Sequence, residues 1–412
     1  MTEPSASPSP AQALSGLRVL DLSRVLAGPW ATQTLGDLGA EVIKVEKPGA
    51  GDDTRGWGPP WLKDGTGNDT RESAYFLTAN RNKRSVTIDM ATTEGQGLIR
   101  RLAATSDVLV ENFKVGGLER YGLDYASLSA LNPRLVYCSI TGFGQDGPEA
   151  QRAGYDFMIQ GMSGLMSVTG SPDTEPQKVG VALVDVLTGL NAAIAVLAAL
   201  EQRHRTGRGQ HIDLALFDVA MASLANQALN FLVGGTAPRR LGNAHPNIVP
   251  YQAFATADGH LILAVGNDAQ FARFCRLADL AELAADPRFS TNRERVANRA
   301  MLLPAIEAAL KRQATGEWLA MLDAAGIPAG PINTIAQAFA EPQALARGLA
   351  MSLPHASGGA APGVRSPLRL GDSPIGAPLA PPLLGQHTDE VLAQVLGLGA
   401  EERAALRAAG VI

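Results

Sequence analysis

The chain has 412 residues, enough for two domains of ordinary size and a substantial core. Its net charge of −5, from 35 basic and 40 acidic residues, argues against a general nucleic-acid-binding protein. The two cysteines, Cys138 and Cys275, form neither a CxxC pair nor a disulfide framework, so the composition fits a reducing compartment such as the cytoplasm. The six histidines include no HxxxH or HExxH pair, and no metal site is predicted.

Residues 1–13 are rich in Ser, Pro and Ala, lack a signal-peptide pattern, and are predicted to form a disordered tail. The first half of the chain then alternates short apolar strands with helices. Strands are predicted at Arg18–Leu22, Glu41–Glu46, Ser85–Asp89, Asp107–Glu111 and Arg134–Ile140, and helices at 29–39, 94–105 and 124–131. This alternation is typical of a parallel α/β sheet with a Rossmann-like order. Neither the GxGxxG fingerprint of dinucleotide-binding proteins nor a P-loop motif is present.

The second half of the chain differs in its pattern. The longest apolar run, 186–200, is 15 residues long, which is short for a membrane span, so we expect a buried helix and no membrane association. The elements expected further on are a long helix over 212–233, a hairpin of Tyr251–Thr256 and His260–Val265, helices near 268–280, 300–313 and 315–325, an extended connection over 353–385, and a helix over 386–409. This mixture indicates a smaller α+β domain at about 245–335.

Asp185 is the most informative single residue. It lies in the otherwise apolar or small run Gly180–Gly189, where a carboxylate must be desolvated, paired or used chemically. An alternative is that Asp185 is the N-cap of the apolar helix, because Asp is a favoured cap. The two interpretations are compatible, since a cap at a glycine-bounded helix start can also be a nucleophile.

Other polar segments each allow a functional and a structural interpretation. Asn80–Ser85 is a basic turn that could hold phosphate or be a solvated loop. Glu111–Phe113 closes a buried strand, where parallel sheets bind ligands, but it could equally be a simple turn. Gly51–Pro60 carries an arginine and a tryptophan and could be a lid, a carboxylate clamp or a surface loop. His245 could be an acid or base, or a structural loop histidine.

Taken together, these segments resemble the class III CoA-transferases of the CaiB/BaiF type, a family that also contains acyl-CoA racemases. The matching segments are Leu14–Leu22, Ala27–Pro29, Leu35–Glu46, Asn82–Ser85, Val110–Phe113 and Pro382–Thr388. In this resemblance Asp185 falls on the family's catalytic aspartate. The resemblance implies an enzyme that uses coenzyme A as substrate and product and holds no tightly bound cofactor.

The resemblance also implies an α/β fold with a Rossmann-like parallel-sheet large domain built from both chain ends, plus a smaller α+β domain. Combined with the predicted elements, it places the first part of the large domain at 14–215, a helical linker at 216–244 and the small domain at 245–335. Residues 336–412 would be a return linker and the C-terminal part of the large domain. Two such chains would form an interlocked-ring homodimer.

The resemblance further implies which residues contact the coenzyme. The positions that match are Arg24, Val25, Leu26, Lys47, Ile88, Asn112, Phe113, Arg120 and Tyr155. In the implied mechanism, Asp185 forms an aspartyl anhydride and then an aspartyl-CoA thioester, as in covalent catalysis by a carboxylate.

Two other functions compete with the transferase. A racemase must move an α-proton, and racemases of the family have a histidine where this chain has Tyr155, whose ordinary pKa near 10 makes it a poor proton shuttle at neutral pH. A non-catalytic CoA-binding protein would have no need to retain Asp185. Among transferases, the formyl-CoA type has a glutamine where this chain has Leu26, which disfavours oxalate as the acceptor.

Several further segments resemble the succinyl-CoA:dicarboxylate transferases, which include glutarate and hydroxymethylglutarate enzymes. They are Gly51–Arg55, Trp57–Pro60, Gln151–Asp156, Ile248–Phe254 and Gly330–Asn333. A dicarboxylic acyl group leaves one free carboxylate that a cation should bind, and arginine suits this bidentate contact. The candidate substrate residues are Arg24, Arg55, Trp57, Arg240 and His245.

Overall fold

The computed structural model describes residues 11–376 and 378–412, so most of the predicted tail at 1–13 lies outside the described residues. The described chain forms two compact units. The first contains residues 11–163, 179–225 and 345–412, and the second contains 164–178 and 226–344. Both ends of the described chain therefore belong to the first unit.

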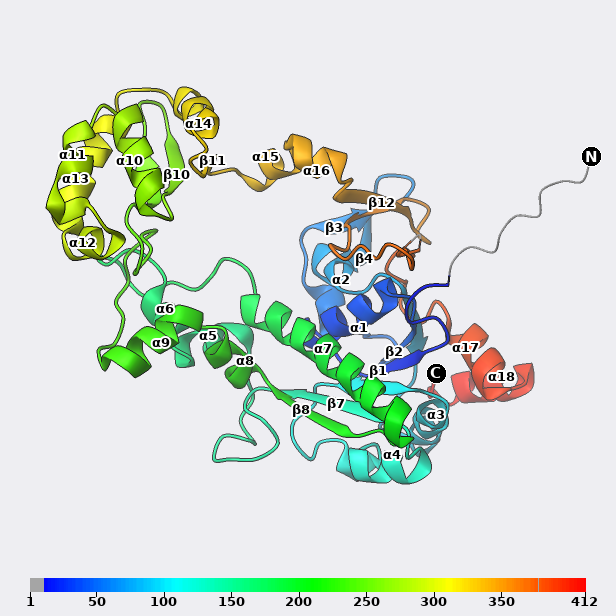
Figure 1. The fold of residues 1–412 in the computed structure, drawn as a ribbon. Helices are drawn as coiled ribbons and strands as arrows, with labels where there is room; N and C mark the ends of the chain where they lie inside the picture. Colours follow the sequence, from blue (N-terminus) through cyan, green and yellow to red (C-terminus); the bar gives the residue numbers. More distant parts are fainter. Residues whose placement is uncertain (1–10, 377) are drawn as a thin grey trace, which may run out of the picture. The chain divides into compact units, whose positions relative to one another are not determined.

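The first unit is built on a six-stranded sheet in which each neighbouring pair of strands is parallel (Figure 1). The strand order is β5-β2-β1-β6-β7-β8. The strands are β1 (Arg18–Asp21), β2 (Glu41–Glu46), β5 (Lys83–Thr87), β6 (Val108–Glu111), β7 (Val136–Thr141) and β8 (His211–Ala215). All six residues of β7 are buried, as expected of a strand covered on both faces of its sheet. The predicted parallel α/β sheet is confirmed.

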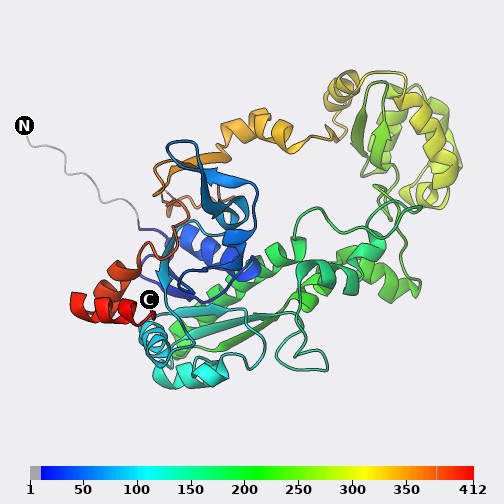
Figure 2. The same cartoon turned by 180° about the vertical axis from the view of Figure 1, so that it is seen from behind.

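The first unit has the following helices, and most of them cover one or the other face of this sheet. They are α1 (Ala27–Asp37), α2 (Ala74–Thr78), α3 (Thr93–Ala104), α4 (Tyr125–Leu131), α5 (Asp156–Met162), α7 (Leu183–Thr206), α8 (Leu216–Ala222), α17 (Thr388–Leu396) and α18 (Ala400–Ala408). Strand residues alternate between two cores: Val108 and Val110 pack with α1 and α7, whereas Leu109 packs with α3, α4 and α17. Figures 1 and 2 show α1 and α7 side by side on one face.

The predicted long helix over 212–233 is wrong. His211–Ala215 is instead strand β8, which pairs in parallel with β7, and it is followed by the separate helices α8 and α9 (Ala225–Gly234). Over a short window the apolar run after Ile212 fits both the period of a helix and that of a strand. Pairing with the open edge of β7 favours the strand. The segment 353–385, predicted to be extended, also contains part of a hairpin formed by β12 (Ala350–Pro354) and β13 (Ala360–Val364).

Helix α7 is the central helix of the first unit. It is 24 residues long, and by length and composition alone it passes the test for a membrane span, which a core helix also passes. Val184, Ala192 and Val196 are buried in the core that α7 shares with α1 and the sheet. Near its C-terminus, the buried Arg203 forms an ion pair of 2.9 Å with Asp107. The predicted buried helix is therefore confirmed for one face only, because Leu190, Ile194 and Leu197 on another face are exposed.

The second unit contains a three-stranded sheet in the order β11-β10-β9. Its strands are β9 (Tyr251–Ala255), β10 (His260–Ala264) and β11 (Ala329–Pro331), and β9 and β10 form the predicted antiparallel hairpin. The remaining helices are α6 (Leu165–Val168), α9, α10 (Asp268–Leu277), α11 (Ala281–Ala285), α12 (Asn292–Ala297), α13 (Arg299–Leu310), α14 (Thr315–Ala324), α15 (Ile335–Ala340) and α16 (Pro342–Ala346). Two of them, α9 and α16, extend past the limits of this unit. Phe254, Leu261 and Trp318 are among the side chains of its own core.

The contact between α1 and α7 depends on Gly189. A Cβ at this position would lie 2.6 Å from the Ala27 carbonyl oxygen and 2.9 Å from the Trp30 Cβ. We predict that Gly189→Ala lowers the free energy of unfolding by about 1–3 kcal/mol, because the two backbones must separate. Urea denaturation measures this change. Gly97→Ala is the matched control in another helix, with nothing within 4 Å of the added Cβ, and should stabilise by about 0.5–1 kcal/mol. Equal effects of the two substitutions would contradict the close approach.

Candidate active site

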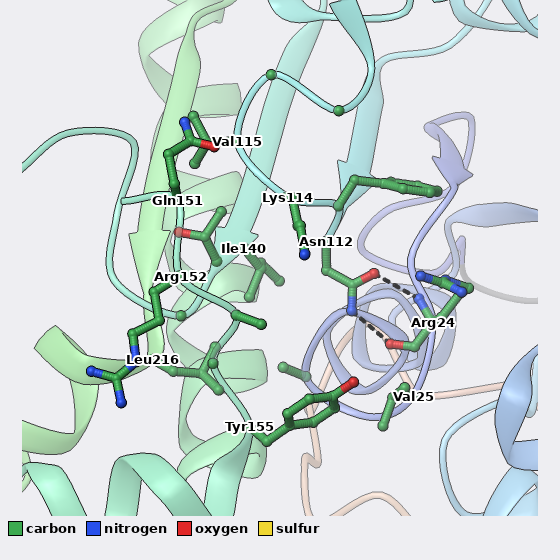
Figure 3. A pocket seen from close by; sticks show the side chains of 18 of the residues that line it. Arg24, Val25, Asn112, Lys114, Val115, Ile140, Gln151, Arg152, Tyr155 and Leu216 are labelled. Atoms are coloured by element: carbon green, nitrogen blue, oxygen red, sulfur yellow. Dashed lines mark hydrogen bonds between the residues drawn. The ribbon is translucent and has the colours of Figure 1, made fainter. Parts of the chain in front are cut away.

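The strand order creates a crevice at one edge of the large sheet. From β1 the chain builds outward through β2 and β5 on one side, and then through β6, β7 and β8 on the other. The carboxyl ends of β1 and β6 are therefore the switch point at which open α/β sheets bind ligands. A cavity of about 760 Å³ lies there, within the first unit (Figure 3). Its wall includes Arg24–Ala27 after β1 and Asn112–Gly117 after β6.

Two loops of this wall are joined by Asn112. Its Oδ1 accepts a hydrogen bond of 2.9 Å from the Arg24 backbone N–H, and its Nδ2 donates one of 2.7 Å to the Arg24 carbonyl, as the dashed lines in Figure 3 show. The Arg24 guanidinium also lies 5.3 Å from the centre of the Phe113 ring. Asn112 thus fixes the β1–α1 loop against the end of β6.

Asp185 faces this cavity from the first turn of α7. The hypothesis that it is the N-cap is wrong, because α7 begins at Leu183 and Ala182 is the N-cap. The cap is supplied by Asp156, whose Oδ1 accepts from the backbone N–H groups of Val184 (2.8 Å) and Asp185 (3.2 Å). Among the described residues, none donates a hydrogen bond to the Asp185 carboxylate, so both of its oxygens are available to a substrate.

The surroundings of Asp185 bring the pKa of its carboxyl group close to neutral pH. Burial, and secondly the negative charge of Asp156, raise the pKa of Asp185 to about 7. A carboxylate with free lone pairs and such a pKa, lining a large cavity, is typical of a reactive group.

A crossing of two backbones brings Asp156 to this position. A Cβ on Gly154 would lie 2.4 Å from the Gly142 Cα, and one on Gly142 would lie 2.6 Å from the Gly154 Cα. Only glycine allows the turn after β7 to touch the segment that leads into α5. This contact places Tyr155 in the cavity wall and Asp156 at the start of α7.

The structure brings together seven of the nine coenzyme positions that were predicted from the sequence. The residues that line the cavity with Asp185 are Arg24, Val25, Leu26, Asn112, Phe113, Arg120 and Tyr155. Lys47 is exposed and lies outside the lining. Ile88 is only 1% exposed and packs in the core between the sheet and α3, so it does not line the cavity either.

Arg55, a candidate for the substrate carboxylate, is occupied by protein carboxylates. Its guanidinium donates to both oxygens of Glu46, at 2.8 and 2.7 Å, and to Glu72 at 2.6 Å, and all three side chains are buried. A second N–H of Nη2 donates to the Pro382 carbonyl at 3.2 Å. We therefore do not assign Arg55 to the substrate.

Of the two other candidates in the first unit, Arg24 lines the cavity and Trp57 does not. Trp57 is exposed and packs edge-on against Tyr75, with 5.0 Å between ring centres. In the second unit, Arg240 donates to backbone carbonyls of the 171–174 turn, and the His245 Nδ1 accepts from the Asn247 N–H at 3.0 Å. These contacts give both residues a structural role within their own unit.

Some lining residues were missed in the sequence. Lys114 and the glycine pair Gly116-Gly117 continue the wall beyond Phe113. A glycine pair shortly after the end of a strand was a usable signal for this turn. Tyr75 is not among the lining residues, but burial, followed by the charges of Asp185, Asp156 and Asp52, raises its pKa, which indicates that it lies near Asp185. Within residues 11–376 and 378–412, no group of three or more His, Cys, Asp or Glu side chains could hold a metal ion.

The fold and the cavity define an α/β protein with a crevice of about 760 Å³ at its switch point. The chain belongs to CoA-transferase family III, which matches residues 14–388. It is 51% identical over 382 residues to the succinate–glutarate CoA-transferase of Agrobacterium fabrum, covering 93% of this chain and 95% of that protein. Over 399 residues it is 45% identical to the succinyl-CoA:glutarate CoA-transferase of Homo sapiens, covering 97% and 90%. A crystal structure of a CAIB/BAIF family protein from Brucella suis is 53% identical, covers 93% of this chain and 100% of that chain, and has a TM-score of 0.82.

Proposed function

We propose that this family III CoA-transferase moves coenzyme A from succinyl-CoA to a dicarboxylic acid such as glutarate. The observation that carries the proposal is the carboxylate of Asp185, which accepts no hydrogen bond from the described residues and lines a cavity of about 760 Å³. The succinate and glutarate in the names of the two relatives above support the choice of donor and acceptor.

In the proposed mechanism, the Asp185 carboxylate attacks the thioester carbonyl of succinyl-CoA, which forms a mixed anhydride and releases the CoA thiolate. The thiolate attacks the aspartyl carbonyl of the anhydride, which releases succinate and leaves an aspartyl-CoA thioester. The acceptor carboxylate then attacks this thioester, and the thiolate returns to the acyl group of the new anhydride. The acceptor leaves as its CoA thioester, and Asp185 is regenerated. One thioester replaces another, so the exchange needs no ATP.

The cationic residues of the wall suit the charges of this substrate. Lys114 and Arg120 both line the cavity and can pair with the phosphates of coenzyme A, and the Phe113 ring can flank the adenine. For the free carboxylate of the acyl group, Arg24 is the remaining candidate from the sequence. Its ion pair with Asp53 is about half exposed, and such a pair exchanges readily because its net stabilisation is small.

We also propose that the enzyme is a homodimer, in the interlocked form that the family resemblance implies. Helix α7 exposes Leu190, Ile194 and Leu197, which recur at helical spacing on one face. The following helices expose further large apolar side chains, among them Leu232 and Val233. An exposed apolar stripe such as the one on α7 is typical of an obligate interface.

The transferase itself is tested by an exchange assay. Purified protein with succinyl-CoA and a panel of dicarboxylates should produce new acyl-CoA, which mass spectrometry detects. Asp185→Asn should reduce the rate by at least about a thousandfold, because the nucleophile is lost. Asp372→Asn, at an exposed position, is the control and should keep full activity. Deuterium entering the α-position of a branched acyl-CoA, without any exchange, would favour the racemase instead.

Asp156 should set the pH dependence of the exchange. Its charge raises the pKa of Asp185, so Asp156→Asn should lower that pKa below about 7 while keeping an oxygen to cap α7. Because the nucleophile is the ionised form, the acid limb of the pH profile of kcat/KM should move to lower pH. An acid limb that stays in place would show that the charge of Asp156 does not reach the nucleophile.

The homodimer is tested by analytical ultracentrifugation. The mass should remain that of two chains on dilution to nanomolar concentration, because interlocked chains cannot separate without unfolding. Ile194→Glu should prevent this assembly, whereas Leu131→Glu, at an exposed leucine on α4, should leave it intact. A wild-type protein that sediments as a single chain would refute the proposal.

A further inference from the structure

A buried ion pair lies beneath the β1–α1 loop, outside the cavity itself. Lys44 and Asp52 meet at 2.9 Å, and the side chains of both are 0% exposed. Neither side chain lines the cavity, and the mechanism above uses neither. A buried pair of this kind is costly to desolvate, so its hydrogen bonds to the rest of the protein must offset that cost.

Lys44 connects the pair to the start of the loop. Its Nζ donates a hydrogen bond of 2.9 Å to the Ser23 carbonyl as well as to Asp52. Burial works against the charge of Lys44, but Asp52 and other carboxylates outweigh it and raise the pKa of Lys44. The ammonium group therefore stays charged, and its hydrogen bond fixes the position of the Ser23 carbonyl.

Asp52 connects the pair to the next part of the loop. Its Oδ1 accepts from the Val25 backbone N–H at 3.3 Å and from the N–H and hydroxyl of Thr54 at 3.0 and 2.8 Å. Burial tends to raise the pKa of Asp52, but Lys44 outweighs it, and the net pKa lies below the usual range. The carboxylate is thus a charged acceptor aimed at Val25.

Val25 needs such a contact because its backbone is strained. Its φ is 70°, in the left-handed region that β-branched residues rarely adopt. A conformation of this kind persists only where the surroundings impose it. Here three consecutive residues are held from outside the loop: Ser23 by Lys44, Arg24 by Asn112, and Val25 by Asp52.

We propose that Lys44 and Asp52 are positioning residues that hold Val25 in the left-handed conformation and so fix the wall formed by Arg24, Val25 and Leu26 for acyl-CoA. The inference rests on the proposed function, because it takes acyl-CoA as the occupant of the cavity. The pair acts through the backbone, so its loss should weaken binding of acyl-CoA more than it slows the chemical steps.

The test is a double-mutant cycle between the pair and Val25. The combined change Lys44→Met and Asp52→Ala removes both charges together, so neither is left buried without a partner. Val25→Gly provides the second background, because glycine adopts a φ of 70° without steric cost. With Val25 present, removal of the pair should raise the KM for succinyl-CoA about tenfold and change kcat less than about threefold. With Val25→Gly, the same removal should raise KM less than about threefold.

An equal rise of KM in both backgrounds, or no rise in either, would overturn the proposal, since a purely stabilising pair would not couple to Val25. If the combined change does not fold, the cycle is run with Asp52→Asn, which keeps the size and the acceptor oxygen; a rise in KM of about threefold that disappears with Val25→Gly is then expected. If the wild-type enzyme shows no acyl exchange, the proposed function fails, and the same cycle is measured as the Kd of coenzyme A by calorimetry. The inference is overturned if coenzyme A does not bind, or if removal of the pair changes the Kd equally with Val25 and with Val25→Gly.

Discussion

The rest of the structure depends on the pairing of β1 with β2 on one side and with β6 on the other. The chain runs from β1 to β2 and β5 on one side of β1 and then to β6 on the other side. The loops after β1 and β6 therefore turn away from each other and open a cavity between them. Asn112 spans this opening and ties the loops together through the Arg24 backbone. The sheet thus sets where the cavity lies, and one amide side chain joins the two loops that form much of its wall.

The arrangement around Asp185 resolves a conflict between stability and reactivity. A carboxylate in the first turn of a helix normally satisfies backbone N–H groups, which would lower its pKa and occupy its oxygens. In this protein Asp156 takes over that task for α7, and the charge of Asp156 then adds to burial in raising the pKa of Asp185. One neighbouring residue therefore stabilises the helix and keeps Asp185 unengaged.

Much of this could be predicted from the sequence, since the strands β1, β2 and β6 are short apolar runs separated by clear helix signals. Asn112 was a candidate because it follows a buried strand, whereas Arg24 was found through the family resemblance. The capping of α7 by Asp156 could not be predicted, because it depends on a contact between residues 28 positions apart in the sequence. The sixth strand was missed for a similar reason: His211–Ala215 has no strong strand pattern, and its partner β7 determines its conformation.

The segment Gly51–Pro60 shows most clearly why side-chain chemistry alone does not assign a role. Its arginine and aspartates have the groups that would bind a substrate carboxylate or cation, and the sequence allowed such a clamp. In the structure the same groups bind other parts of the protein: Arg55 binds Glu46 and Glu72, and Asp52 binds Lys44 and the Val25 backbone. A left-handed valine costs of the order of 1–3 kcal/mol, and a set of buried, fully paired charges is rigid enough to hold it. The segment therefore contributes to the site by fixing the backbone of the cavity wall through Asp52, and not by binding the substrate through Arg55.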